Sequence, residues 1–176
     1  MPDIILATFN ARYEHPSLGL RCLMANLGPL AGRAAMREFT LETRAAEAAE
    51  VLLDLSPRIV GLGVYVWNAR ESAALAAELK AIKPELVIVM GGPEAGRGGR
   101  AARHADYVIC GEGEKAFPEL CSRLLAGERP AEKFIAAEPP DPSGLELPYG
   151  LYSDDDIANR VTYAEASRGC PFGCEF

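Results

Sequence analysis

The chain has 176 residues, a formal net charge of −7 and 49% hydrophobic residues, so we expect a globular protein with a buried core. An acidic chain without basic clusters is a poor partner for nucleic acid, and no apolar run is long enough to cross a bilayer. The five cysteines show no spacing typical of a disulfide framework, which indicates a reducing compartment and a cytoplasmic protein.

Short apolar runs alternate with helical stretches along the first 125 residues. The runs predicted to be strands are residues 4–9, 37–42, 59–65, 86–90 and 107–110. Helices are predicted after Ser17 and at residues 45–55, 69–82, 99–105 and 115–125. This alternation is typical of right-handed βαβ units and a parallel sheet. We therefore predict an α/β fold with an open, flavodoxin/Rossmann-like sheet of five strands in the order 2-1-3-4-5, with the second strand at an edge.

The chain changes character after residue 127. Residues 128–160 are rich in proline and are predicted to be a linker that lies over a surface. Within it, Ser153 could cap a short helix that contains Asp156, but a solvated acidic loop is the favoured interpretation. Residues 161–166 are predicted to be the first strand of another domain. The expected divisions are a domain at 1–127, a linker at 128–160 and the start of a further domain at 161–176.

A ligand of an open parallel sheet binds beyond the carboxyl ends of the strands, where the strand order reverses. That edge is built here from the loops after the first, third, fourth and fifth strands. The candidate binding residues in these loops are Asn10, His15, Ser17, Tyr65, Trp67, Gly91, Gly92, Pro93, Glu94, Gly111, Glu112 and Gly113. Glycines crowd the last two loops, which suits a large ligand pressed against backbone.

Several of these residues have a simpler interpretation that the sequence leaves open. His15 could be a loop histidine that makes an ordinary hydrogen bond, and Trp67 could cover the edge of the core. Gly91 and Gly92 could form a turn between a strand and a helix. Glu112 could be a solvated acid placed favourably near a helix start. The order of the loops is more specific than any one of them.

The last ten residues contain Cys170 and Cys174 within the sequence R-G-C-P-F-G-C. Cysteine thiolates hold iron–sulfur clusters, and close spacing lets one loop wrap one corner of a cluster. The segment resembles the cluster loop of the radical S-adenosylmethionine (radical SAM) enzymes, C-x-x-x-C-x-x-C. We therefore expect part of a longer enzyme, cut within this motif, in which both cysteines are metal ligands. A zinc knuckle is less favoured, since the sequence offers no second Cys/His pair.

Together, the sheet and its loops resemble the cobalamin-binding domain that precedes the barrel in cobalamin-dependent radical SAM enzymes. The matching stretches are residues 10–20, 65–68, 91–94 and 111–114. The resemblance implies that the corrin ring lies on the carboxyl edge and that the nucleotide tail runs down beside Gly91 and Gly92. It also implies a methyltransferase-like reaction that uses a 4Fe–4S cluster and S-adenosylmethionine in the intact enzyme only. This chain alone is expected to be inactive.

One part of the match departs from the pattern of other cobalamin proteins. Residues 14–19 read E-H-P-S-L-G, where cobalamin mutases have D-x-H-x-x-G. The resemblance therefore leaves open whether His15 is a cobalt ligand, and it makes Tyr65 and Trp67 candidates for packing below the corrin. The alternative is a flavodoxin-like docking or regulatory module of a radical SAM protein that has lost its cofactor.

Overall fold

The computed structural model describes residues 1–96 and 101–168, in which six parallel strands form one open sheet of order β2-β1-β3-β4-β5-β6. The strands are β1 (Ile4–Asn10), β2 (Ala34–Thr40), β3 (Ile59–Gly63), β4 (Val87–Gly91), β5 (Tyr107–Cys110) and β6 (Phe134–Ala136). The predicted fold class and the order of the first five strands are confirmed, including β2 at an edge. The strand order reverses between β1 and β3.

The sixth strand lies in the stretch predicted as a linker, so the predicted count of five strands is wrong. Phe134–Ala136 pairs in parallel with Val108–Cys110. Its three residues are too few for a periodic pattern to show in the sequence. The pairing covers an edge of β5 that would otherwise expose unpaired backbone groups.

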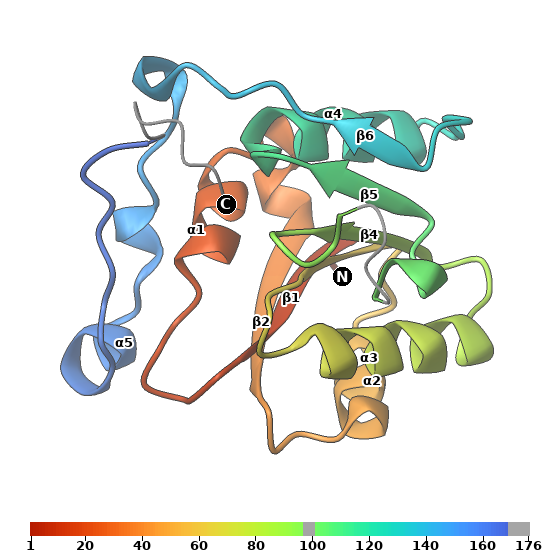
Figure 1. The fold of residues 1–176 in the computed structure, drawn as a ribbon, viewed down its shortest axis with the longest axis horizontal. Helices are drawn as coiled ribbons and strands as arrows, with labels where there is room; N and C mark the ends of the chain where they lie inside the picture. Colours follow the sequence, from red (N-terminus) through yellow and green to blue (C-terminus); the bar gives the residue numbers. More distant parts are fainter. Residues whose placement is uncertain (97–100, 169–176) are drawn as a thin grey trace, which may run out of the picture.

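Helices cover both faces of the sheet, with α1 and α4 on one face and α2 and α3 on the other (Figure 1). The helices on these faces are α1 (Leu18–Ala25), α2 (Ala45–Leu53), α3 (Ala69–Ile82) and α4 (Gly113–Leu125). Short 3-10 helices are η1 (Gly28–Arg33), η2 (Ala101–His104), η3 (Pro142–Gly144) and η4 (Pro148–Leu151). Ser17 begins α1 as predicted, since its hydroxyl accepts a hydrogen bond from the Leu20 N–H at 3.2 Å. None of the described helices is both long and apolar enough to span a bilayer.

The acidic run near residue 155 is not the solvated loop that we favoured. It forms a short helix, α5 (Asp154–Asn159), whose first turn is capped by Ser153. Asp156 reaches back to the Ser153 N–H and is buried. The sequence shows the capping residues, but it does not show the partners that draw Asp156 inward.

Residues 161–168 form no strand, contrary to the prediction, and we call this segment the strap. Hydrogen bonds from two tyrosine hydroxyls, rather than pairing with a strand, hold the strap in position. Tyr149 donates to the Glu165 carbonyl and accepts from the Glu165 N–H, both at 3.0 Å. Tyr152 makes the same pair of bonds to Tyr163, at 3.0 and 3.2 Å. The strap, at the blue end of Figure 1, is thereby fastened beside the carboxyl edge of the sheet.

Candidate functional site

A cavity of about 470 Å³, which we call the slot, lies between the carboxyl half of the sheet and helices α1 and α4. Gly63 at the end of β3 and Gly91 at the end of β4 are register partners and form its sheet wall. Side chains alternate between the faces of a strand, so both glycines face the side that α1 and α4 cover. Two adjacent strands thus end without a side chain where the slot begins.

The space in front of the sheet wall is open at the level of Gly91 and filled at the level of Gly61. A Cβ placed on Gly91 would meet nothing nearer than the Ile109 carbonyl oxygen, at 3.9 Å. A Cβ placed on Gly61, two residues earlier in β3, would lie 2.9 Å from the ring of Phe117. Phe117 of α4 therefore packs directly on the β3 backbone and closes the inner end of the slot.

The mouth of the slot carries a cluster of charges around Arg168 of the strap. Its Nη1 lies 3.1 Å from Glu112 and 2.5 Å from Glu114, and its Nε lies 2.8 Å from Glu165. Burial lowers the pKa of Arg168, but the hydrogen bond and the charge of Glu114 outweigh this and hold the pKa above its ordinary value. A charged guanidinium therefore lies across the mouth, bound to three carboxylates.

A second cavity of about 550 Å³, which we call the shelf, lies beside the slot at the point where the strand order reverses. Tyr65 lines both cavities, and its ring stacks on Trp67 with centroids 4.7 Å apart. Trp67 remains 46% exposed, and its Nε1 donates to the Phe9 carbonyl at 3.3 Å. On the opposite side, Tyr163 Oη lies 2.6 Å from His15 Nδ1. Stacked aromatic rings with one open face are typical of a binding surface.

The loop between β3 and α3 is held by one buried amide, Asn68. Its Oδ1 accepts from the Tyr65 N–H at 2.8 Å, and its Nδ2 donates to the carbonyls of Phe9 and Gly63 at 2.9 and 3.1 Å. These bonds join the ends of β1 and β3 and fix the position of the two stacked rings. The sequence prediction missed this role.

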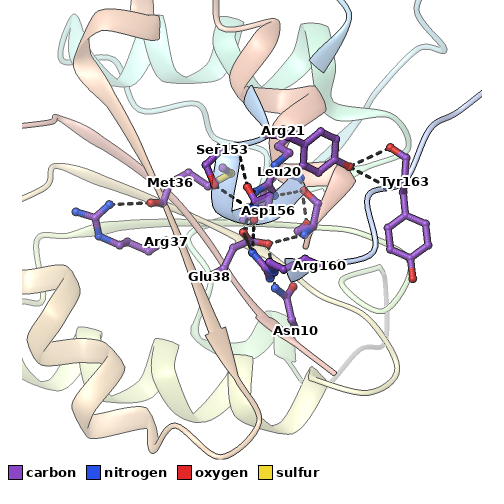
Figure 2. Close-up of polar contacts among 12 residues, drawn as sticks. Asn10, Leu20, Arg21, Met36, Arg37, Glu38, Ser153, Asp156, Arg160 and Tyr163 are labelled. Atoms are coloured by element: carbon purple, nitrogen blue, oxygen red, sulfur yellow. Dashed lines mark hydrogen bonds and ion pairs between the residues drawn. The ribbon is translucent and has the colours of Figure 1, made fainter. Parts of the chain in front are cut away.

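A buried group of charges packs against the loop after β1. This group, which we call the ion cluster, consists of Arg21, Glu38, Asp156 and Arg160 (Figure 2). Arg21 is 2% exposed, and its Nη2 lies 2.8 Å from Asp156. Arg160 Nη1 lies 2.7 Å from the other oxygen of Asp156 and 3.2 Å from Glu38. Four charges of alternating sign thus connect β2, α1 and α5.

Glu38 also accepts hydrogen bonds from the loop that follows β1, and Asp156 remains charged within the ion cluster. Glu38 Oε1 accepts from Asn10 Nδ2 at 2.9 Å and from the Ser17 N–H. Burial raises the pKa of Asp156, but the Ser153 N–H together with both arginines outweighs this and lowers the pKa to about 2. The cluster therefore fixes the loop between Asn10 and Ser17 to the segment that leads into the strap.

The predicted site residues divide between the two cavities. The slot is lined by Tyr65, Gly91, Gly92, Pro93, Gly111, Glu112 and Gly113, and the shelf by Asn10, His15, Ser17, Tyr65 and Trp67. Glu94 lines neither cavity; its side chain is exposed and its N–H donates to the Val64 carbonyl at 3.3 Å. Cys170 and Cys174 lie outside the described residues. Within residues 1–96 and 101–168, no group of three His, Cys, Asp or Glu side chains could hold a metal ion.

Two of the predicted glycines are needed by the chain itself. Gly92 has a φ of +102°, and a Cβ there would lie 2.4 Å from the Val64 carbonyl oxygen. Gly111 has a φ of +110°, and a Cβ there would lie 2.9 Å from the Ala137 carbonyl oxygen. Both positions exclude L side chains whether or not a ligand is present.

Several residues that line the two cavities were absent from the list of candidate binding residues, although some of them lie in the predicted site loops. They are Gly19, Cys22, Gly61, Gly63, Glu114, Phe117, Tyr163, Glu165 and Arg168. Gly61 and Gly63 carried a signal, because glycines inside the predicted strand 59–65 indicate close packing or the close approach of a ligand. Gly19 carried no such signal. Glycine is needed there because a Cβ would lie 2.7 Å from the hydroxyl of Tyr65, a residue distant in the sequence.

Three comparisons with known proteins agree with this architecture. The sequence model of the B12 binding domain matches residues 4–121. A 2-(S-pantetheinyl)-carbapenam-3-carboxylate methyltransferase from Streptantibioticus cattleyicolor is 32% identical over 147 residues, which cover 68% of this chain and 22% of the relative. The cobalamin-dependent radical SAM methyltransferase TokK from Streptomyces tokunonensis is 27% identical over 149 residues, which cover 69% of this chain and 22% of the relative. This chain thus spans about a fifth of the length of these two relatives.

Among solved structures, a cobalamin-binding protein from Desulfitobacterium hafniense DCB-2 matches with a TM-score of 0.50 and 20% identity. The match covers 69% of this chain and 58% of that one, and it shows a shared fold. The family match runs from β1 into α4, of which it includes all but the last four residues, and it leaves out the strap. This chain therefore belongs to the B12-binding domain family.

Proposed function

We propose that this chain binds cobalamin with the nucleotide tail in the slot and the corrin ring over the shelf, as part of a cobalamin-dependent radical SAM methyltransferase. The observation that carries the proposal is the slot itself. Gly63 and Gly91 leave an open space between the sheet and helices α1 and α4, at the edge where α/β sheets bind their ligands.

The residues present suit the chemistry of this cofactor. The two cavities have volumes of about 470 and 550 Å³, within the range of about 300–1,000 Å³ typical of small-molecule sites. The tail ends in a flat aromatic base, which suits a narrow space between a sheet and two helices. The corrin rim carries primary amides, whose N–H groups suit the carboxylates of Glu112 and Glu114. The exposed face of Trp67 suits the flat underside of the ring.

The contribution of these residues to the reaction is binding and orientation. A bound cobalamin would supply a carrier for a methyl group. Methyl transfer in the intact protein is inferred from two relatives that are named methyltransferases, one of them a cobalamin-dependent radical SAM enzyme. Within that proposal, Cys170 and Cys174 would supply two thiolates to a 4Fe–4S cluster that works with S-adenosylmethionine. The contact of His15 with Tyr163 involves Nδ1 only, so it orients the ring and is equally compatible with a loop histidine and with a cobalt ligand.

A visible-absorbance titration with hydroxocobalamin tests the proposal. The wild-type chain should give a saturable spectral change, and Gly91→Leu, which fills the slot from an unstrained position, should weaken binding at least tenfold, or about 1.4 kcal/mol. Gly32→Leu is the matched control, because Gly32 is exposed and has nothing within 4 Å of its Cβ position. A wild-type chain that shows no saturable change would refute cobalamin binding.

One observation favours the alternative of a docking module without cofactor. Arg168 and Glu165 of the strap themselves line the slot, so the chain partly closes its own cavity. In that case, the strap would be a permanent part of the wall, and the slot would be a structural gap beneath it. The same titration separates the two functions, since a docking module would leave the spectrum of hydroxocobalamin unchanged at every protein concentration.

A further inference from the structure

Polar and apolar groups are separated along the length of the slot. The strands run toward the mouth, so residues two positions before Gly63 and Gly91 lie at the inner end. The inner end is lined by Leu6, Gly61, Val89 and Phe117, whereas Ile109 lies level with Gly91, nearer the mouth. None of these four inner residues carries a polar side-chain atom, and Leu6, Val89 and Phe117 are at most 2% exposed.

The backbone at the inner end has no hydrogen-bonding capacity to spare either. Leu6, Gly61 and Val89 are register partners across three adjacent strands. Their N–H and C=O groups are therefore directed along the sheet into the parallel ladder, and not into the slot. A ligand group at this level would find neither a donor nor an acceptor among these residues.

The polar side chains that line the slot belong to its mouth. They are Tyr65, Glu112, Glu114, Glu165 and Arg168. Cys22 of α1 also lines the slot; burial raises the pKa of its thiol, and the charge of Arg168 partly offsets this. A ligand that spans the slot thus meets charged groups first and hydrocarbon last.

We propose that the inner end of the slot selects the base of the cofactor tail, accepting a benzimidazole with hydrocarbon edges and rejecting a purine with an exocyclic amine. This inference rests on the proposed function. An amine placed against Leu6, Val89 and Phe117 loses its hydrogen bonds to water without replacement, and such a loss is costly. We expect cobalamin to bind roughly tenfold or more tightly than its adenine-tailed analogue.

The test compares three corrinoids in their cyano forms, by calorimetry or spectral titration of the wild-type chain. They are cobalamin, the adenine-tailed analogue and tail-less cobinamide. Cobalamin should bind most tightly. Equal affinities for the two tailed corrinoids would overturn the inference while leaving the proposed function intact. Equal affinities for cobalamin and cobinamide would overturn the placement of the tail in the slot. If none of the three binds, the proposed function falls, and the inference falls with it.

A pair of variants on β4 makes the test specific to the inner end. Val89→Thr adds a hydroxyl at nearly constant volume and should narrow the preference for cobalamin several-fold, since the amine then gains a partner. Val87→Thr is the matched control, because Val87 lies on the same face of the same strand but does not line the slot. An unchanged preference in Val89→Thr, with a native circular dichroism spectrum, would contradict the assignment. If that variant does not fold, the comparison of the tailed corrinoids on the wild-type chain decides.

Discussion

Asp156→Asn tests whether the ion cluster fastens α5 to the binding loop. The change keeps the size of the side chain and an oxygen that can cap α5, but it removes the charge between Arg21 and Arg160. The pKa of Asp156 is about 2 in the folded protein, against an ordinary value of 3.8. The difference corresponds to about 2 kcal/mol of folding stability at pH 7. We therefore expect the variant to lose about 2 kcal/mol at that pH.

The pH dependence of this loss follows from the direction of the shift. A lowered pKa means that the unfolded chain binds the proton more tightly than the folded protein does. The stabilisation is therefore complete above about pH 5 and is lost progressively as the pH falls through about 2. With the two pKa values of Asp156, about 1 kcal/mol of it is already gone at pH 3. The difference between wild type and variant should shrink by that amount.

Urea denaturation at pH 7 and pH 3 measures both effects. At pH 7 the midpoint of the variant should fall by about 1 M, given typical urea slopes for a chain of this size. Asp154→Asn is the matched control, because it removes the same charge from an exposed position in the same helical turn and should change stability by less than about 0.5 kcal/mol. A deficit of equal size at both pH values would refute the role of the charge. No deficit at pH 7 would refute the role of the cluster.

Three further substitutions separate the functions of single residues around the two cavities. Gly92→Ala should lower the melting temperature of the cofactor-free protein, because its φ of +102° and the Val64 carbonyl exclude a Cβ; an unchanged melting temperature would contradict this. Arg168→Gln should speed cobalamin association, measured by stopped-flow absorbance, and make the rate less sensitive to salt, because the guanidinium that three carboxylates hold across the mouth of the slot is removed. An unchanged association rate would show that the mouth does not limit entry. Trp67→Ala should weaken cobalamin binding several-fold, whereas Val66→Ala, at a neighbouring residue that is 76% exposed, should not; equal effects would exclude a specific role for the indole.

The strands of the sheet centre could be predicted because each is buried on both faces. Residues 4–9 and 59–63 are continuous apolar runs, which is the pattern of a central parallel strand. β2 at the edge is partly exposed along its whole length, so its sequence has no such run and its predicted bounds were three residues late at the start. β6 had no signal at all. Sequence patterns thus located the fully buried central strands accurately, the half-buried edge strand β2 less accurately, and β6 not at all.

The ion cluster could not be predicted from the sequence, for a reason of distance along the chain. Arg21 and Asp156 are 135 residues apart, and nothing in the local pattern of either indicates the other. An acidic run such as residues 154–156 is usually solvated, and Asp154 and Asp155 do remain exposed. Asp156 differs from them because two arginines and a helix cap converge on it. Local sequence predicts the cap, and tertiary packing decides which acid is buried.

The glycines show most clearly what sequence can and cannot say about the binding site. Gly92 and Gly111 stood out in the sequence, yet their positive φ and close backbone neighbours explain them without a ligand. Gly63 and Gly91 have no such constraint, since a Cβ at either would make only ordinary contacts of 3.4 Å or more. Because the chain itself does not require glycine at these two positions, the space that they leave is what indicates a ligand. The case for a cofactor tail in the slot therefore depends on the two glycines that the fold could replace.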